Sequence, residues 1–268
     1  MSTLLELFDS LSRDYGEHDA VASSTSSWCY AEISFSSDAL AAQLVYRFGT
    51  PDILLMDLNR CAAAELATVI ACRRLGILFC PVDGTDPLRL KQIVQVLQNG
   101  RNNKTAERLP APRIAAAVLA NNDRDPRLTS FYHAGVHFCI LLNEAGDMLE
   151  PMSVPSMLPK ARTSQVKDDL YILFTSGTTS KQPKAVIGSH RETLRRLQWF
   201  VDEIHEGDET VIIARRTPLV FIDGIHELFS VLLHGASPAK LYCDVALVDL
   251  VQHSTRCLLY TSPSPRDS

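Results

Sequence analysis

Three features that would narrow the function class are missing from this sequence of 268 residues: a long apolar run, paired cysteines and an excess of basic charge. No apolar stretch approaches the roughly 20 residues that a membrane-spanning helix needs. The seven cysteines are scattered without C-x-x-C spacing, which argues against a metal site or a disulfide framework. With 26 basic and 31 acidic residues the formal net charge is -5, so no face for nucleic acid is expected.

The beginning of the chain also lacks the pattern of a targeting peptide. Met1–Asp19 is acidic and has neither the apolar core of a signal peptide nor the arginine-rich character of a transit peptide. Together these absences predict a cytoplasmic protein that has no membrane span and does not bind nucleic acid.

What is present is an alternation of helix and strand patterns. Apolar residues recur at helical spacing, and glycines follow several of these segments, as glycines do at helix ends. Helices are expected over Thr3–Tyr15, from an N-cap cluster at Ser36, Ser37 and Asp38 to Gly49, over Arg60–Leu75, along Leu90–Leu97 before Gly100, near Pro126–Ala134, over Glu192–Ile204 and along Ile225–Leu232 before Gly235.

Short apolar runs between these segments have the length of buried strands. They include Ile53–Met56, Ile77–Cys80, Arg113–Ala120, Val136–Leu142, Leu170–Phe174, Ala185–Ile187 and Thr210–Ala214. Asn143–Lys167 contains three prolines and is expected to be a surface connector. The alternation predicts an α/β fold whose mainly parallel sheets are covered by helices.

A run of small, mostly hydroxylated residues follows the expected strand Leu170–Phe174. It begins with Thr175–Thr179 and is followed, just before the next strand, by Lys184. Small side chains let a ligand approach the backbone, and hydroxyl and backbone N–H groups donate to anionic oxygens. Lys184 adds a mobile positive charge suited to phosphate. The pattern indicates a polyphosphate site, although an ordinary Ser/Thr-rich turn stays open on these residues alone.

This loop is not a P-loop of the Gly-x4-Gly-Lys-[Ser/Thr] kind, because the second glycine and the lysine are absent at that spacing. It resembles instead the phosphate loop of the adenylate-forming superfamily, which includes acyl-CoA synthetases, luciferases and amino-acid adenylation domains. That loop reads Thr-Ser-Gly-Thr-Thr-Gly-x-Pro-Lys-Gly, and the match runs through Thr179. Ser180 and Ala185 replace glycines, and with Gln182 there is one residue more before Pro183.

Three other segments resemble motifs of the same superfamily in the same order: Trp28–Ile33, Gly76–Pro87 and Thr217–Ala236. The resemblance is strongest to amino-acid adenylation domains and to β-alanine-activating members of the acyl-CoA synthetase family. It implies that a carboxylic or amino acid is activated with ATP and Mg²⁺. The acyl group would then pass to a thiol, from coenzyme A or from the phosphopantetheine of a carrier-protein domain.

By this resemblance, the triphosphate is held by Thr175, Ser176, Gly177, Thr178, Thr179 and Lys184. Residues 1–256 would be the N-terminal part of the large domain. The catalytic lysine would lie downstream, so no catalytic or metal-binding residue is expected here and the chain alone is expected not to adenylate. A non-catalytic remnant that folds or binds nucleotide without turnover is the alternative. A kinase-like enzyme is disfavoured by the absent Gly-Lys-[Ser/Thr].

Phe221 and Asp223 are weaker candidates for substrate binding. In amino-acid adenylation domains an aspartate directly after the motif phenylalanine anchors the substrate's ammonium group, but here Ile222 stands in that place and Asp223 follows it. Asp223 serves the substrate if the backbone is bulged, or else it is the N-cap of a helix. His190 and Glu227 are expected to be packing or capping residues more than chemical ones.

The last residues break the preceding pattern. The segment Cys257–Asp267 turns into a Ser-Pro repeat and resembles a translated sequencing adapter of the transposase type. Residues 257–268 are therefore expected not to be native and are left out of the fold prediction. A genuine disordered Ser/Pro tail is the alternative.

Overall fold

The computed structural model describes residues 3–58, 61–99, 112–119, 124–143, 168–175, 182–204, 212–232, 239–243 and 257–258. The chain divides into two compact units. The central unit is the uninterrupted segment Phe35–His190, and the terminal unit combines Met1–Ser34 with Arg191–Ser268. The two boundaries fall inside helices, so no loop in the sequence marks either of them.

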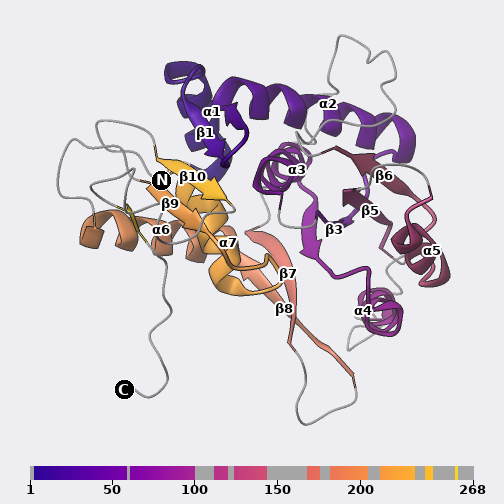
Figure 1. Ribbon diagram of the computed structural model, residues 1–268. Helices are drawn as coiled ribbons and strands as arrows, with labels where there is room; N and C mark the ends of the chain where they lie inside the picture. Colours follow the sequence, from indigo (N-terminus) through magenta and orange to yellow (C-terminus); the bar gives the residue numbers. More distant parts are fainter. Residues whose placement is uncertain are drawn as a thin grey trace, which may run out of the picture. The chain divides into compact units, whose positions relative to one another are not determined.

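The central unit contains a six-stranded sheet in the order β6-β5-β3-β4-β7-β8 (Figure 1). Every neighbouring pair is parallel except β7 and β8, which are antiparallel. The strands are β3 (Ile53–Asp57), β4 (Leu78–Pro81), β5 (Ile114–Leu119), β6 (Cys139–Leu142), β7 (Asp169–Thr175) and β8 (Lys184–Ser189). The prediction of mainly parallel strands alternating with helices is confirmed.

Helices α4 (Pro87–Asn99) and α5 (Pro126–His133) cover one face of this sheet (Figure 1). The predicted stripe of α4 packs there with alternate residues of β3, β4 and β5 and with Phe131 of α5. Alternation places every second residue of a strand on the same face, which is why one stripe is enough to cover it. Helix α3 (Ala62–Leu75) is alanine-rich and almost wholly buried, and it ends at Gly76 in the left-handed conformation, as predicted.

The terminal unit has a five-stranded sheet in the order β11-β9-β10-β1-β2. Its strands are β1 (Asp19–Ala22), β2 (Ser27–Cys29), β9 (Ile212–Arg215), β10 (Lys240–Cys243) and β11 (Cys257–Leu258). Its helices are α1 (Leu4–Asp14), α7 (Ile222–Phe229), the short 3-10 helix η1 (Ser230–Leu232) and most of α6 (His190–Ile204). Strand β1 pairs in parallel with β10, so the two ends of the unit's sequence share one sheet.

Tyr30, at the start of α2 (Tyr30–Phe48), ties the early part of the terminal unit to its late part. The ring is fully buried, and the hydroxyl lies 2.7 Å from the carbonyl oxygen of Val231 and 2.8 Å from that of Ala239. Removal from water raises the pKa of this phenol, so it stays a donor at neutral pH. The early motif Trp28–Ile33 therefore contains a residue that joins two distant parts of the terminal unit.

The predicted N-cap at Ser36, Ser37 and Asp38 is wrong. Helix α2 already begins at Tyr30, so these residues lie inside it. Two of them contact α3 instead: Arg74 lies 2.7 Å from Asp38 and donates to the Ser37 hydroxyl at 3.2 Å. The helix start is satisfied by Glu32, whose carboxylate accepts from the backbone N–H of Cys29 at 2.8 Å.

The other predicted helices and strands are present, with boundaries shifted by a few residues. The connector expected over Asn143–Lys167 lies outside the described residues apart from Asn143, as do Gly100 and Gly235. Within the described part of the chain, no helix has both the length and the apolar character needed to cross a bilayer.

Candidate functional site

The predicted strand–loop–strand arrangement is present as the hairpin β7–β8. The register pairs Thr175 with Lys184 at the loop end of the hairpin, where β7 ends and β8 begins, so these two predicted phosphate-binding residues face each other across neighbouring strands. Both are exposed. The other four, Ser176, Gly177, Thr178 and Thr179, lie outside the described residues, and their role stays a prediction.

The loop end of the hairpin extends beyond the end of the neighbouring strand β4. Phe79 of β4 is paired with Tyr171 of β7, and β4 ends at Pro81. Phe174 and Thr175 therefore have a strand partner only on the β8 side. Arg89, from the first turn of α4, donates to the Thr175 carbonyl oxygen at 2.9 Å. Thr175 is thus paired with Lys184 in the register and hydrogen-bonded to Arg89 from another element.

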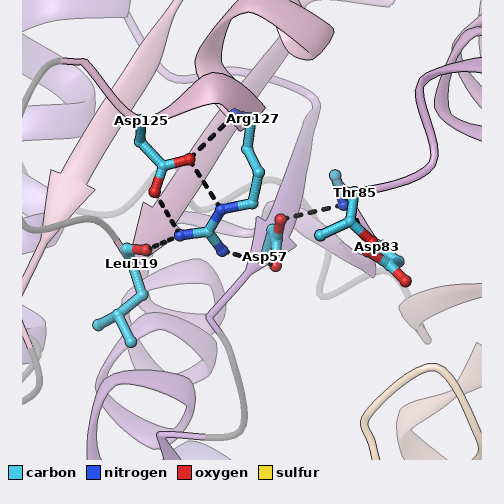
Figure 2. Close-up of polar contacts among 7 residues, drawn as sticks. Asp57, Asp83, Thr85, Leu119, Asp125 and Arg127 are labelled. Atoms are coloured by element: carbon cyan, nitrogen blue, oxygen red, sulfur yellow. Dashed lines mark hydrogen bonds and ion pairs between the residues drawn. The ribbon is translucent and has the colours of Figure 1, made fainter.

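A polar cluster lies at the carboxyl ends of β3 and β5 (Figure 2). Asp57, the last residue of β3, is 3.2 Å from the Arg127 guanidinium and accepts from the backbone N–H of Gly84 at 3.0 Å. Arg127 also donates to Asp125 at 2.7 Å and to the carbonyl oxygen of Leu119, the last residue of β5. Both Asp57 and Arg127 are mostly buried.

The electrostatics of this cluster follow from its burial. Burial raises the pKa of Asp57, and the nearby Arg127 charge only partly opposes that shift. The hydrogen bonds from Arg127 hold the pKa of the more exposed Asp125 below its usual range. The connection from β3 leads to β4 on one side of the sheet, and the connection from β5 leads to β6 on the other side. Open α/β sheets usually bind ligands between two such strands, at their carboxyl ends. Here the chain's own ion pairs occupy that position.

Phe221 and Asp223 lie in the terminal unit, at the start of α7. Phe221 is the residue that precedes the helix and is exposed, and Asp223 is in the first helical turn. Asp223 is therefore not the N-cap, and α7 is regular at this point, without the bulge that would move Asp223 to the place of Ile222. A carboxylate in the first turn interacts favourably with the helix dipole.

Glu227 is a structural carboxylate. One carboxylate oxygen accepts from Arg215 at 3.1 Å and from the backbone N–H groups of Arg216 and Thr217 at 2.8 Å each, and the other accepts from the Thr217 hydroxyl at 2.6 Å. The side chains of Glu227 and Arg215 are each 2% exposed. The prediction that Glu227 is a packing residue is confirmed. His190 is buried where α6 begins, and its function stays untested.

His226, next to Glu227 in α7, should make the fold sensitive to acid. Burial, together with the nearby Arg196 charge, lowers the pKa of His226 to about 4. The neutral imidazole therefore stabilises the fold above the unfolded pKa near 6.5, and this stabilisation is lost as the pH falls toward 4. We expect the free energy of unfolding to fall by about 1.5 kcal/mol between pH 6.5 and pH 5 from this group.

Urea titrations at several pH values, followed by tryptophan fluorescence, measure this dependence, because both tryptophans, Trp28 and Trp199, belong to the terminal unit. His226→Phe should flatten the profile over this range. His18→Gln, at an exposed histidine of the same unit, should keep the wild-type slope. An unchanged slope in His226→Phe would show that other groups cause the pH dependence.

Three residues at or near these sites were not anticipated from the sequence: Arg89, Asp57 and Arg127. Each follows or faces the carboxyl end of a parallel strand, and the alternation of strands and helices already places such positions at one edge of a sheet. Charged residues just after apolar runs were therefore an available indication for Asp57. Nothing in the spacing indicated that Arg89 contacts a residue 86 positions away.

Comparisons with known proteins agree with this architecture. A family model described as AMP-binding enzyme matches residues 8–258. The chain is 25% identical over 240 residues to nonribosomal peptide synthetase kk1B of Curvularia clavata, an alignment that covers 88% of this chain and 2% of that protein. It is 24% identical over 237 residues to surfactin synthase subunit 2 of Bacillus subtilis, covering 87% and 6%. The chain thus spans a small part of these relatives.

Solved structures with a similar fold include VinN in complex with 3-methylaspartate, with a TM-score of 0.65 and 16% identity, covering 96% of this chain and 65% of that one. They also include o-succinylbenzoate CoA synthetase (MenE) from Bacillus subtilis, with a TM-score of 0.63 and 16% identity, covering 92% and 45%. At these identities the likeness concerns the fold.

Proposed function

Because this chain belongs to the AMP-binding enzyme family, we propose that it carries the phosphate-binding part of an enzyme that activates a carboxylic or amino acid with ATP. The observation that carries this proposal is the pairing of Thr175 with Lys184 at the loop end of the hairpin β7–β8. Arg89 donates to the Thr175 carbonyl oxygen at the same end. Such a constellation suits the oxygens of a triphosphate.

In the proposed reaction the substrate carboxylate attacks the α-phosphorus of ATP and pyrophosphate leaves, which gives an acyl-adenylate. A thiol from coenzyme A or a carrier's phosphopantetheine then displaces AMP and forms a thioester. The ammonium group of Lys184 would interact with the β- and γ-phosphate oxygens and stabilise the charge that develops on the departing pyrophosphate. The remaining catalytic groups are assigned to sequence that follows this chain in a longer protein.

Mg²⁺ would enter with ATP, bound to its phosphate oxygens. Among the residues that the structure describes, no group of three or more His, Cys, Asp or Glu side chains is placed to hold a metal ion. We therefore assign no magnesium ligand to the described residues.

An amino acid is the substrate class that we favour. One relative is named as a nonribosomal peptide synthetase, and VinN is described in complex with 3-methylaspartate. A carrier-protein domain would then be the partner. The alternative is nucleotide binding without turnover. The observation in support of it is that Ser180 and Ala185 replace glycines of the loop.

The test of the phosphate assignment is the affinity of the 268-residue chain for MgATP. Lys184→Ala should raise the Kd for MgATP roughly tenfold, because it removes a charge-assisted contact of about 1.5 kcal/mol at an exposed position. Isothermal titration calorimetry with MgATP, and with Mg²⁺ alone as a blank, measures the change.

Lys91→Ala is the matched control, because Lys91 is an exposed lysine of α4 in the same unit. The control should bind MgATP as tightly as the wild type. Equal affinities of Lys184→Ala and wild type would remove Lys184 from the site, and no binding by the wild type would contradict the proposed function.

A further inference from the structure

The hairpin β7–β8 needs support where it leaves the sheet. Beyond Tyr171 the register of β7 against β4 runs out within two residues, at Pro81, and Thr175 lies past that point. A two-stranded hairpin alone is at best marginally stable in water. The contact from Arg89 to the Thr175 carbonyl oxygen, at 2.9 Å, gives this end of β7 a hydrogen-bond partner outside the hairpin.

The backbone of Arg89 is fixed by two hydrogen bonds at the start of α4 and in the turn before it. Its backbone N–H donates to the Asp86 carboxylate at 2.9 Å, so Asp86 satisfies one of the free donors at the start of α4. The turn that leads into Asp86 is fixed at Gly84, whose N–H donates to the buried carboxylate of Asp57. Arg89 therefore projects from a helix start whose backbone is anchored.

We propose that Arg89 is a positioning residue: its hydrogen bond to Thr175 holds the loop end of the hairpin so that Thr175 and Lys184 are presented together to the phosphates of ATP. This inference rests on the proposed function. Arg89 acts through the backbone of Thr175. Its effect on binding therefore comes from the fraction of molecules in which Thr175 and Lys184 are paired, and not from a contact with ATP.

The experiment compares the 268-residue wild type with Arg89→Ala and Arg89→Lys by amide hydrogen exchange without nucleotide and by calorimetric titration with MgATP. Arg89→Ala should speed exchange in β7 and β8 about fivefold and raise the Kd for MgATP by up to about fivefold, the loss expected from one net hydrogen bond. Arg89→Lys should recover most of both, because its ammonium group can donate to the same carbonyl oxygen.

Arg113→Ala is the matched control. Arg113 also donates to a backbone carbonyl oxygen, that of Gly49 at 2.7 Å, but it lies just before β5, at the amino end of the sheet. This variant should change neither the exchange of the hairpin nor the affinity for MgATP.

Several results would overturn the proposal. Weaker MgATP binding by Arg89→Ala with unchanged exchange would mean that Arg89 contacts the nucleotide directly. Faster exchange over the whole central unit, or equal effects of Arg113→Ala, would mean a general loss of stability. Unchanged MgATP affinity in Arg89→Ala would reject the positioning role. Absence of MgATP binding by the wild type would remove the proposed function, and the positioning role with it.

Discussion

Replacing Glu227 with alanine is expected to destabilise the terminal unit by about 3–5 kcal/mol, the range for breaking a buried ion pair. The carboxylate accepts four hydrogen bonds that join α7 to the end of β9. Its removal leaves the Arg215 charge and two backbone N–H groups without these acceptors in a site that is 2% exposed. Because both tryptophans belong to this unit, urea unfolding followed by tryptophan fluorescence measures the loss.

Two further variants separate charge from burial. Glu227→Gln keeps an oxygen that accepts from the backbone but removes the charge opposite Arg215, so its loss of stability should lie between those of wild type and alanine. Glu192→Ala breaks an exposed pair with Arg195 in the same unit, at 3.0 Å, and should cost at most about 0.5 kcal/mol. Similar losses for Glu227→Ala and Glu192→Ala would show that the buried network contributes little.

Gly188→Ala is expected to destabilise the central unit by about 3 kcal/mol, at the upper end of overpacking effects. Gly188 is paired across β8 and β7 with Tyr171, and a methyl group on it would overlap the Tyr171 ring. The ring has little room to move, because it is buried and packs against Phe79 with ring centroids 5.8 Å apart. The urea midpoint of the far-ultraviolet circular dichroism signal should fall more than that of tryptophan fluorescence.

A second substitution tests the cause. Tyr171→Leu in the Gly188→Ala background should recover part of the lost stability, so that the two changes together cost less than the sum of their separate effects. Gly76→Ala is the control, because its methyl group would meet nothing within 4 Å and only the left-handed backbone, with φ of 67°, is unfavourable there. That control should cost about 1–2 kcal/mol. Additive effects of Tyr171→Leu and Gly188→Ala would rule out the steric explanation.

The local elements could be predicted from sequence because their causes are local. The stripe of α4, the glycine after α3 and the short apolar run of β7 each depend on residues within a few positions of one another. The error at Ser36–Asp38 has the opposite origin. These residues have the chemistry of an N-cap, but Arg74 from another helix binds them, and no local pattern reveals a partner so far along the chain.

The candidate site divides in the same way. The strand–loop–strand order and the facing of Thr175 and Lys184 follow from two short apolar runs separated by turn residues. Arg89 could not be predicted, because it lies in an amphipathic helix whose apolar stripe accounts for the sequence without it. The division into two units was equally hidden, because both boundaries fall within helices that continue without a break.

Strand β1 cannot pair with β10 until most of the chain has been synthesised. Its register partners Leu241 and Tyr242 in β10 leave the ribosome after all six strands of the central unit. Closing so long a loop is slow, whereas the central unit is a continuous segment that can form its sheet first. Until then Ala20, Val21 and Ala22, which are buried in the finished sheet, belong to a lone hairpin with an open apolar edge that chaperones can bind.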